Sequence, residues 1–390
     1  MDKKNQRPEF HGSDLEKIAA YYHIPASEIP GIIKFGANVN PLGLSESVKN
    51  DLAGHLDIIS SYPDRNYTSL KKTIGEYCHI SPKHIVVGNG STELISLLIS
   101  QRQAKKALVV GPTYSEYERE LALTGGTITE YNLKEDLNFQ LDMQDFFASM
   151  ADDVDLLILC NPNNPTGAVY PKEILEQIVQ IAREKELIIF SDEIYDRLVM
   201  DGYEHTSIAS LAPDVFCVTF SGLSKSHMIA GFRIGWMILS GAKDKAKGYI
   251  EGIKMLSSMR LCSNVPAQSI VQTALGGYQS VTEYIKPGGR VYEQRECIYN
   301  ALKDIPGISV VKPHAAFYIF PKIDTEKFNI TNDEQFALDF LHEKQVLIVP
   351  GKGFNWMKPD HFRIVYLPNI RQLEKSMEKL REFLRTYQQR

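Results

Sequence analysis

Short runs of apolar residues recur along the first three quarters of the chain, and helical patterns separate them. The runs are almost continuously apolar, which is typical of strands buried on both faces of a parallel sheet. Strands that alternate with helices predict the α/β class, here a mostly parallel seven-stranded sheet between helices. The expected strands are residues 85–88, 107–110, 127–131, 156–160, 187–191, 215–220 and 235–239.

The pattern changes after residue 285, where a Pro-Gly-Gly sequence at 287–289 interrupts the chain. The terminal segment has Leu373, Met377, Leu380 and Leu384 on one helical face. The other elements expected there are helices at 290–303 and 334–344 and strands at 317–320, 346–349 and 362–366. We therefore expect a large domain at 46–285 and a smaller α+β domain at 286–390, which residues 1–45 join as an N-terminal arm.

The composition argues against several classes of protein. A net charge of −5 predicts neither a nucleic-acid partner nor a polybasic membrane patch. The first residues lack the apolar stretch of a signal peptide, and no apolar run is long enough to span a membrane, so a cytoplasmic location is expected. The five scattered cysteines form no C-x-x-C pair, and the ten histidines form no H-E-x-x-H pattern. These absences argue against a disulfide framework and against a metal site.

The sequence G-N-G-S-T-E at 88–93 links the first expected strand to a helix. Free N–H groups at such a helix start favour a phosphate, and the hydroxyls of Ser91 and Thr92 could add donors. Glu93 replaces the third glycine of G-x-G-x-x-G, which weakens the reading as a dinucleotide site. A plain strand–helix turn with an N-cap is the alternative.

Two further motifs follow expected strands. N-P-N-N-P-T-G at 161–167 would project amide side chains at a strand's carboxyl end, where open α/β sheets bind ligands. A rigid turn is the alternative, although a structural turn does not need three asparagines. In S-D-E-I-Y at 191–195, Asp192 would be costly to bury without a cationic partner such as a protonated pyridine nitrogen. Its alternative role is a helix N-cap.

The fourth motif, S-G-L-S-K at 221–225, follows another apolar strand. Apolar neighbours on both sides predict that Lys225 is half-buried, and burial lowers a lysine pKa as a nucleophile requires. Arg233, eight residues later, suits a phosphate because its guanidinium offers a fork of donors.

Together these four segments resemble the pyridoxal-phosphate-dependent aminotransferases of class I/II, which have the aspartate-aminotransferase fold. The motifs that carry the resemblance are N-P-x-N-P-T-G, S-D-E-x-Y, and S-x-x-S-K followed by G-F-R-x-G, and the likeness covers nearly the whole chain. It implies an enzyme that uses pyridoxal phosphate and forms a homodimer with shared active sites.

The resemblance also implies residue roles. Lys225 corresponds to the lysine that holds the cofactor as a Schiff base and then acts as acid and base. Asp192 corresponds to the carboxylate that keeps the pyridine nitrogen protonated, which makes the ring an electron sink. Tyr195 and Asn164 correspond to the pair that hydrogen-bonds the phenolic oxygen, and Tyr114 to the aromatic residue that stacks on the ring.

Other roles concern the phosphate and the substrate. The residues that correspond to the phosphate-binding cup are Gly90, Ser91, Thr92, Ser224 and Arg233. Tyr62 corresponds to the tyrosine that reaches the phosphate from the partner subunit. Arg363 corresponds to the arginine that clamps the substrate carboxylate through a bidentate contact, with Asn38 and Asn164 beside it. The family often has Ser or Thr where this chain has Gly222, so Ser221 or Ser224 must supply that hydroxyl, and we expect Ser224.

Within the family the two ends of the sequence differ. Residues 11–12, 35–43 and 62–64 resemble histidinol-phosphate aminotransferase and, more closely, threonine-phosphate decarboxylase. The stretch from 192 to 295 resembles bacterial alanine (glutamate–pyruvate) aminotransferases, as in Y-I-E-G at 249–252 and L-G-G-Y at 275–278. This longer stretch favours amino transfer between a small L-amino acid, such as alanine, and a 2-oxo acid, with glutamate and 2-oxoglutarate as the second pair.

Three alternatives remain at this point. A histidinol-phosphate aminotransferase or a threonine-phosphate decarboxylase would have the same fold, and a phosphorylated substrate would need an extra basic residue, for which Arg260 is a candidate. A pyridoxal-phosphate-sensing regulator would need a DNA-binding domain before residue 45, where the chain is too short for one.

Overall fold

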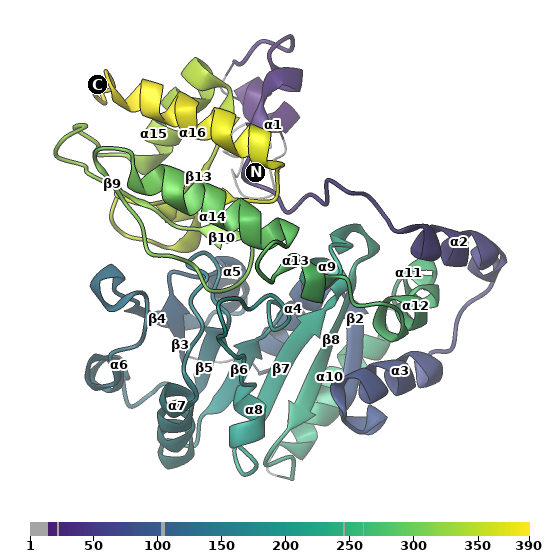
Figure 1. The fold of residues 1–390 in the computed structure, drawn as a ribbon. Coiled ribbons are helices and arrows are strands. Elements are labelled where there is room, and N and C mark those ends of the chain that lie inside the picture. The colour runs from purple at the N-terminus through teal and green to yellow at the C-terminus, as the bar shows by residue number, and fades with distance from the viewer. Residues whose placement is uncertain (1–14, 22, 103–105, 245, 260) are drawn as a thin grey trace.

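The computed structural model describes residues 15–21, 23–102, 106–244, 246–259 and 261–390. Two features named above, the segment at 11–12 and Arg260, lie outside the described residues. The described chain has a large part around one broad sheet and a smaller part above it, in which the first described helix, α1 (Leu15–Tyr21), and the C-terminal end both lie (Figure 1).

The large part is organised by a sheet of seven described strands in the order β2-β8-β7-β6-β5-β3-β4. The strands are β2 (Ile85–Asn89), β3 (Lys106–Gly111), β4 (Thr127–Asn132), β5 (Leu156–Cys160), β6 (Ile188–Asp192), β7 (Cys217–Gly222) and β8 (Ile234–Ser240). Strands β3 to β7 pair in parallel, whereas β8 runs antiparallel to both β2 and β7. The predicted α/β class and mostly parallel seven-stranded sheet are confirmed.

Helices cover both faces of this sheet. Leu108 and Val110 pack with α7 on one face, whereas Ala107 and Val109 pack with α4, α5 and α10 on the other. Burial on both faces explains why the strands read as continuous apolar runs. The helices of the large part are α2 (Glu46–Gly54), α3 (Thr68–Cys78), α4 (Ser91–Arg102), α5 (Glu116–Leu123), α6 (Met143–Ser149), α7 (Lys172–Glu184), α8 (Ile208–Leu211), α9 (Leu223–Ser226), α10 (Lys247–Met259), α11 (Val265–Ser269), α12 (Val271–Gly276) and α13 (Val281–Tyr284).

The smaller part combines short strands with long helices. Its elements are α1 (Leu15–Tyr21), β1 (Ile33–Lys34), α14 (Arg290–Lys303), β9 (Ile308–Ser309), β10 (Tyr318–Ile319), β11 (Lys322–Ile323), α15 (Asp333–Lys344), β12 (Val346–Leu347), β13 (Val349–Pro350), β14 (Phe362–Val365) and α16 (Ile370–Leu384). The N-terminal strand β1 pairs in parallel with β12, which ties the beginning of the chain to its last quarter.

The strand expected at 346–349 is two strands in the structure. β12 pairs with β1, whereas β13 pairs antiparallel with β14 in another sheet. Ile348 lies between them and is fully buried, so the apolar pattern continues across the break and the sequence alone does not show it.

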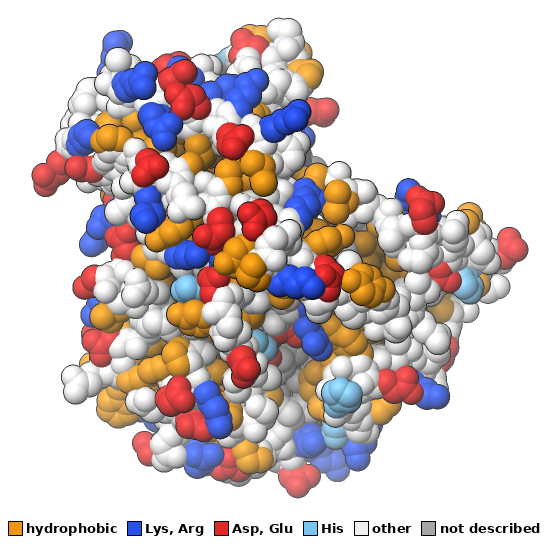
Figure 2. All heavy atoms as spheres, in the orientation of Figure 1, with side chains coloured by type: hydrophobic (Ala, Val, Ile, Leu, Met, Phe, Trp, Pro, Cys, Tyr) orange, Lys and Arg blue, Asp and Glu red, His pale blue; other side chains and the backbone are white. Residues whose placement is uncertain are grey.

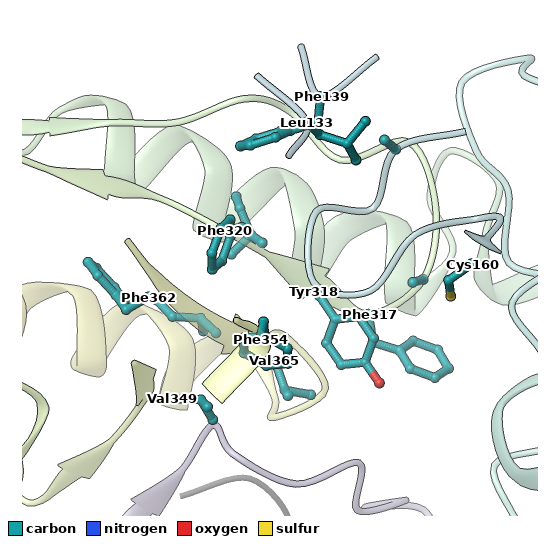
Figure 3. Packing of buried hydrophobic residues seen from close by; sticks show 14 of the residues in the cluster. Leu133, Phe139, Cys160, Phe317, Tyr318, Phe320, Val349, Phe354, Phe362 and Val365 are labelled. Carbon is teal, nitrogen blue, oxygen red and sulfur yellow. The ribbon is translucent and has the colours of Figure 1, made fainter. Parts of the chain in front are cut away.

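A continuous hydrophobic cluster joins the two parts. It includes Leu133, Phe139 and Cys160 of the large part and Phe317, Phe320 and Phe362 of the small part (Figure 3). The rings of Phe139 and Phe320 meet across the junction at a tilt, with centroids 6.1 Å apart. Because the cluster is shared, side chains from both parts are held in fixed positions at the junction. None of the helices in the described ranges is both long and apolar enough to cross a membrane. Acidic and basic groups are interspersed over the face in Figure 2.

Candidate active site

A cavity of about 170 Å³ opens where strands β5, β6 and β7 end at their carboxyl edge, beneath the small part. Parallel strands bring the residues after each strand to the same edge, so motifs far apart in sequence meet there. The residues that line the cavity are Asn38, Ser91, Thr92, Tyr114, Cys160, Asn164, Asp192, Ile194, Tyr195, Ser224, Lys225, Ala230, Arg233 and Tyr318.

Lys225 and Asp192 both line this cavity, and they follow or end the neighbouring strands β7 and β6. Lys225 is half-buried in the short helix α9 after β7, and its Nζ lies 6.0 Å from the centroid of the Tyr195 ring. Asp192 is the last residue of β6 and is buried. A turn follows it, and the next helix begins only at Ile208, so Asp192 is not a helix N-cap.

The charge state of Asp192 depends on opposing influences. Burial raises the pKa of its carboxyl group, whereas hydrogen bonds from Tyr117 and from the Ile194 N–H, and the charge of Lys225, act in the lowering direction. A buried carboxylate at the edge of a ligand cavity is stabilised by a cationic partner, such as a protonated ring nitrogen.

Hydroxyl and guanidinium donors gather at another side of the cavity. Ser91 and Thr92 stand at the start of α4, and Ser224 lies in α9. Arg233 is the residue immediately before β8. Gly90 has a φ of +84°, and a Cβ there would lie 2.3 Å from Arg233 Nη2. Glycine is therefore required for the guanidinium to approach the helix start. This donor set suits a phosphate group.

Glu93, where a dinucleotide motif would have glycine, has a structural role. Its Oε2 accepts the backbone N–H of Asn89 at 2.7 Å, and its Oε1 accepts from the Asn89 side chain at 3.3 Å. The carboxylate closes the turn between β2 and α4, so the turn and the phosphate-type donors are compatible features of one segment.

The structure explains why this chain has glycine at position 222, where the resembled family often has serine or threonine. Gly222 pairs with Gly235 of the antiparallel strand β8, and a Cβ at 222 would lie 2.6 Å from the Ile234 carbonyl oxygen. A serine or threonine does not fit there without moving the strand. Of the two hydroxyls considered as its replacement, that of Ser224 lines the cavity, whereas Ser221 is not among the lining residues.

In the asparagine-rich turn at 161–167, two asparagines hold the turn together and one lines the cavity. Asn161 Oδ1 accepts the Tyr170 N–H at 3.0 Å, and Asn163 Oδ1 accepts the Thr166 hydroxyl at 2.7 Å. Only Asn164 of the three lines the cavity. The expectation that a structural turn does not need these asparagines was therefore wrong for Asn161 and Asn163, whose side chains close the turn.

Arg363 of β14 adjoins the cavity and is fully buried. Its Nη1 donates to Asn164 Oδ1 at 2.9 Å and its Nη2 to the Gly36 carbonyl at 3.2 Å, while Nε has no acceptor among the described residues. The guanidinium lies 4.4 Å from the Tyr318 ring centroid. Burial lowers the pKa of Arg363, since none of these partners is a carboxylate. Such a group is well suited to bind an incoming carboxylate.

Two more of the expected residues line the cavity, and a third lies outside it. Asn38 lines the cavity, and its buried Oδ1 has no donor among the described residues. Tyr114 lines the cavity at the start of α5. Tyr62, by contrast, is 82% exposed and lies outside this cavity, on a hollow beside α3 and α11.

Sequence reasoning did not find two tyrosines of the site. Tyr318 is fully buried, lines the cavity, and its hydroxyl lies 3.0 Å from that of Tyr195 (its ring is labelled in Figure 3). Tyr117 is buried behind the cavity and donates to Asp192 Oδ2 at 2.8 Å. Burial and the neighbouring Tyr318 raise the pKa of Tyr195 well above its usual value, so its phenol stays protonated and can donate.

A buried charge pair supports the loop that carries Asp192 and Tyr195. Glu193 accepts from Ser191 Oγ at 2.9 Å and pairs with His205 at 3.1 Å. Burial alone would lower the pKa of His205, but the hydrogen bond to Glu193 and its charge outweigh burial and raise the pKa. The pair fixes the chain between β6 and α8, from which the site residues project.

The family model, the sequence relatives and the solved structures to which this chain is similar all belong to the aminotransferases. The model of the family described as aminotransferase class I and II matches residues 30–380. Glutamate-pyruvate aminotransferase AlaA of Haemophilus influenzae is 47% identical over 363 residues, which cover 90% of each chain. Alanine aminotransferase of Mycobacterium tuberculosis is 44% identical over 307 residues, 78% of this chain and 72% of that protein. A crystal structure of an aminotransferase from Escherichia coli has a TM-score of 0.91 at 43% identity, covering 97% of this chain and 96% of that one.

Proposed function

The chain belongs to the class I and II aminotransferases, and from this premise we propose that it exchanges an amino group between alanine and 2-oxoglutarate, giving pyruvate and glutamate. Enzymes of this family generally depend on pyridoxal phosphate. When bound, that cofactor withdraws electrons from the substrate Cα, which makes the proton on that carbon acidic.

The residues of the cavity fit this cofactor. Lys225 offers the amine that would hold its aldehyde, and Asp192 offers the buried anion that a protonated ring nitrogen needs. Ser91, Thr92 and Arg233 would hold the phosphate. Tyr114 would lie against the ring, while Tyr195 and Asn164 would contact its phenolic oxygen, and these roles accord with the positions that the side chains have around the cavity.

The observation that carries the proposal is the uncompensated charge of Arg363. A fully buried guanidinium whose described partners are neutral would bind the α-carboxylate of an amino acid or a 2-oxo acid. Asn38 and Asn164 would position the same carboxylate. Lys225 Nζ, once free, would take the proton from the substrate Cα, since it is the lining residue with a mobile basic nitrogen.

Tyr318 and Ile194 line the cavity, and their bulk accords with a small substrate side chain. The relatives named as alanine or glutamate–pyruvate aminotransferases favour this substrate over histidinol phosphate and over decarboxylation of a phosphorylated threonine. A substrate phosphate would need its own cation, and the lining cations Lys225 and Arg233 both have cofactor roles.

We also propose that the active unit is a homodimer. Exposed apolar side chains include Leu56, Ile59 and Tyr62, in the segment that follows α2, and Met255 and Met259 on α10. Apolar exposure of this kind marks a protein interface. In a dimer, Tyr62 would reach the phosphate side of the partner's cavity, which would explain a tyrosine that lies outside its own.

The proposal is tested by mixing the purified protein and pyridoxal phosphate with 2-oxoglutarate and a panel of amino acids. We expect glutamate to form fastest with alanine, in amounts equal to the pyruvate produced. Carbon dioxide without glutamate, or glutamate only with a phosphorylated donor, would contradict the proposal.

A further inference from the structure

A buried phenol stands behind the carboxylate of the site. Tyr117 of α5 is 2% exposed, and its hydroxyl donates to Asp192 Oδ2 at 2.8 Å. It does not line the cavity, so it reaches the ligand position only through Asp192. Its ring also meets the ring of Tyr114 edge-on, with centroids 5.8 Å apart.

The two oxygens of Asp192 have separate donors. Oδ2 accepts from Tyr117, and Oδ1 accepts from the Ile194 N–H at 3.2 Å. Among the described residues, Tyr117 is the side chain that hydrogen-bonds this carboxylate. Each carboxylate oxygen can accept more than one hydrogen bond, so capacity remains for a ring N–H on the cavity side.

The groups around Asp192 explain why the Tyr117 hydroxyl matters for its charge. Asp192 lies beside the buried thiol of Cys160, its partner in the sheet register, and near the charges of Lys225 and Glu193. Burial favours the protonated acid, and the Tyr117 hydrogen bond is the largest of the influences that oppose burial. A hydrogen bond to a buried carboxylate stabilises its charged form.

We propose that Tyr117 is a positioning residue that keeps Asp192 ionised and thereby keeps the ring nitrogen of the cofactor protonated. The inference rests on the proposed function, because it needs the cofactor in this cavity. It differs from a purely packing role in one respect. Packing in the cluster with Leu121 and Phe190 needs only the ring of Tyr117, whereas the proposed role needs its hydroxyl.

The test uses Tyr117→Phe, which keeps the ring and removes the hydroxyl. Holoenzyme is prepared with pyridoxal phosphate labelled with ¹⁵N in the ring, and the ¹⁵N chemical shift separates a protonated from a neutral pyridine nitrogen. The matched control is Tyr131→Phe, because Tyr131 is equally buried but its hydroxyl bonds to the backbone of Asp142 in another region.

We expect the wild type and Tyr131→Phe to show a protonated ring nitrogen, and Tyr117→Phe to move toward the neutral value. Loss of a hydrogen bond to a charged group should lower kcat about 10- to 100-fold, with little change in KM for alanine. An unchanged shift in Tyr117→Phe would overturn the inference, whatever its activity.

A wild type that binds no labelled cofactor would instead overturn the proposed function itself, so the two failures are distinguishable. Should Tyr117→Phe not fold, Tyr117→Met fills the space with a flexible side chain and carries the same expectation for the ¹⁵N shift.

Discussion

Two arginines in the described part of the chain are fully buried, and their surroundings differ in kind. Arg295 of α14 donates to both oxygens of Asp201 at 2.7 Å and to Glu296 at 2.7 Å, so it has two carboxylates of its own chain. Arg363 of β14 has an amide oxygen, a carbonyl oxygen and aromatic faces. The two guanidinium groups are therefore equally buried, but only that of Arg295 has carboxylate partners that balance its charge.

The difference separates a structural ion pair from the group that we propose binds the substrate. Arg295 joins α14 to the loop at Asp201, and hence the small part to the large part, through contacts that the folded chain already supplies. Arg363 has a charge that the described residues do not balance, at the edge of a cavity lined by Lys225 and Asp192. A buried charge without a counter-charge is unfavourable for folding, so its presence points to a ligand that brings the anion.

The largest effect is expected from Arg363→Met, which removes the uncompensated charge. Because the variant cannot pair with the substrate carboxylate, kcat/KM for alanine should fall by about three orders of magnitude, roughly 4 kcal/mol. The free energy of unfolding of the cofactor-free protein should not fall, since no ion pair is lost. Steady-state kinetics and urea unfolding measure the two effects, and loss of cofactor with an unchanged KM would contradict this role.

Arg295→Met should show the opposite pattern. Removing one partner of a buried ion pair leaves Asp201 and Glu296 without their cation, and we expect the free energy of unfolding to fall by about 3 kcal/mol. This is the lower end of the usual range because both carboxylates are partly exposed. KM for alanine in the folded protein should stay near the wild-type value. A double-mutant cycle with Asp201→Asn isolates the pair, and a raised KM without destabilisation would contradict the comparison.

Much of the fold and of the cavity could be predicted from sequence because the signals are local. Buried strands appear as apolar runs, and Lys225, Asp192 and Asn164 each stand in the short motif that follows such a run. The direction of β8 could not be read, because an apolar run looks the same in either sense. Tyr117 and Tyr318 were missed for a related reason: each has the composition of a core residue, and each reaches its partner across a long sequence separation, 75 and 123 residues. The available signal was that Tyr117, in the first turn of α5, follows Tyr114 by three residues.

The smallest effect concerns another buried charged contact, the Glu193–His205 pair in the segment between β6 and α8. The pKa of His205 is raised in the folded protein, so the pair's contribution to stability is fully present below the unfolded pKa, about 6.5. The contribution should be lost as pH rises from there through the higher pKa that His205 has in the folded protein. Urea unfolding at several pH values should show this decline in the wild type, and it should be absent in His205→Gln. Stability of the wild type that instead rises across this window would show that the histidine is held neutral.

The claim on which the account depends is that one amine, that of Lys225, holds the cofactor opposite Asp192. Reduction of the purified, cofactor-loaded protein with borohydride, followed by peptide mass spectrometry, measures this directly. The account predicts a yellow protein whose reduced pyridoxyl label is found on the peptide that contains Lys225. A label on another lysine, or a protein that takes up no cofactor, would contradict it.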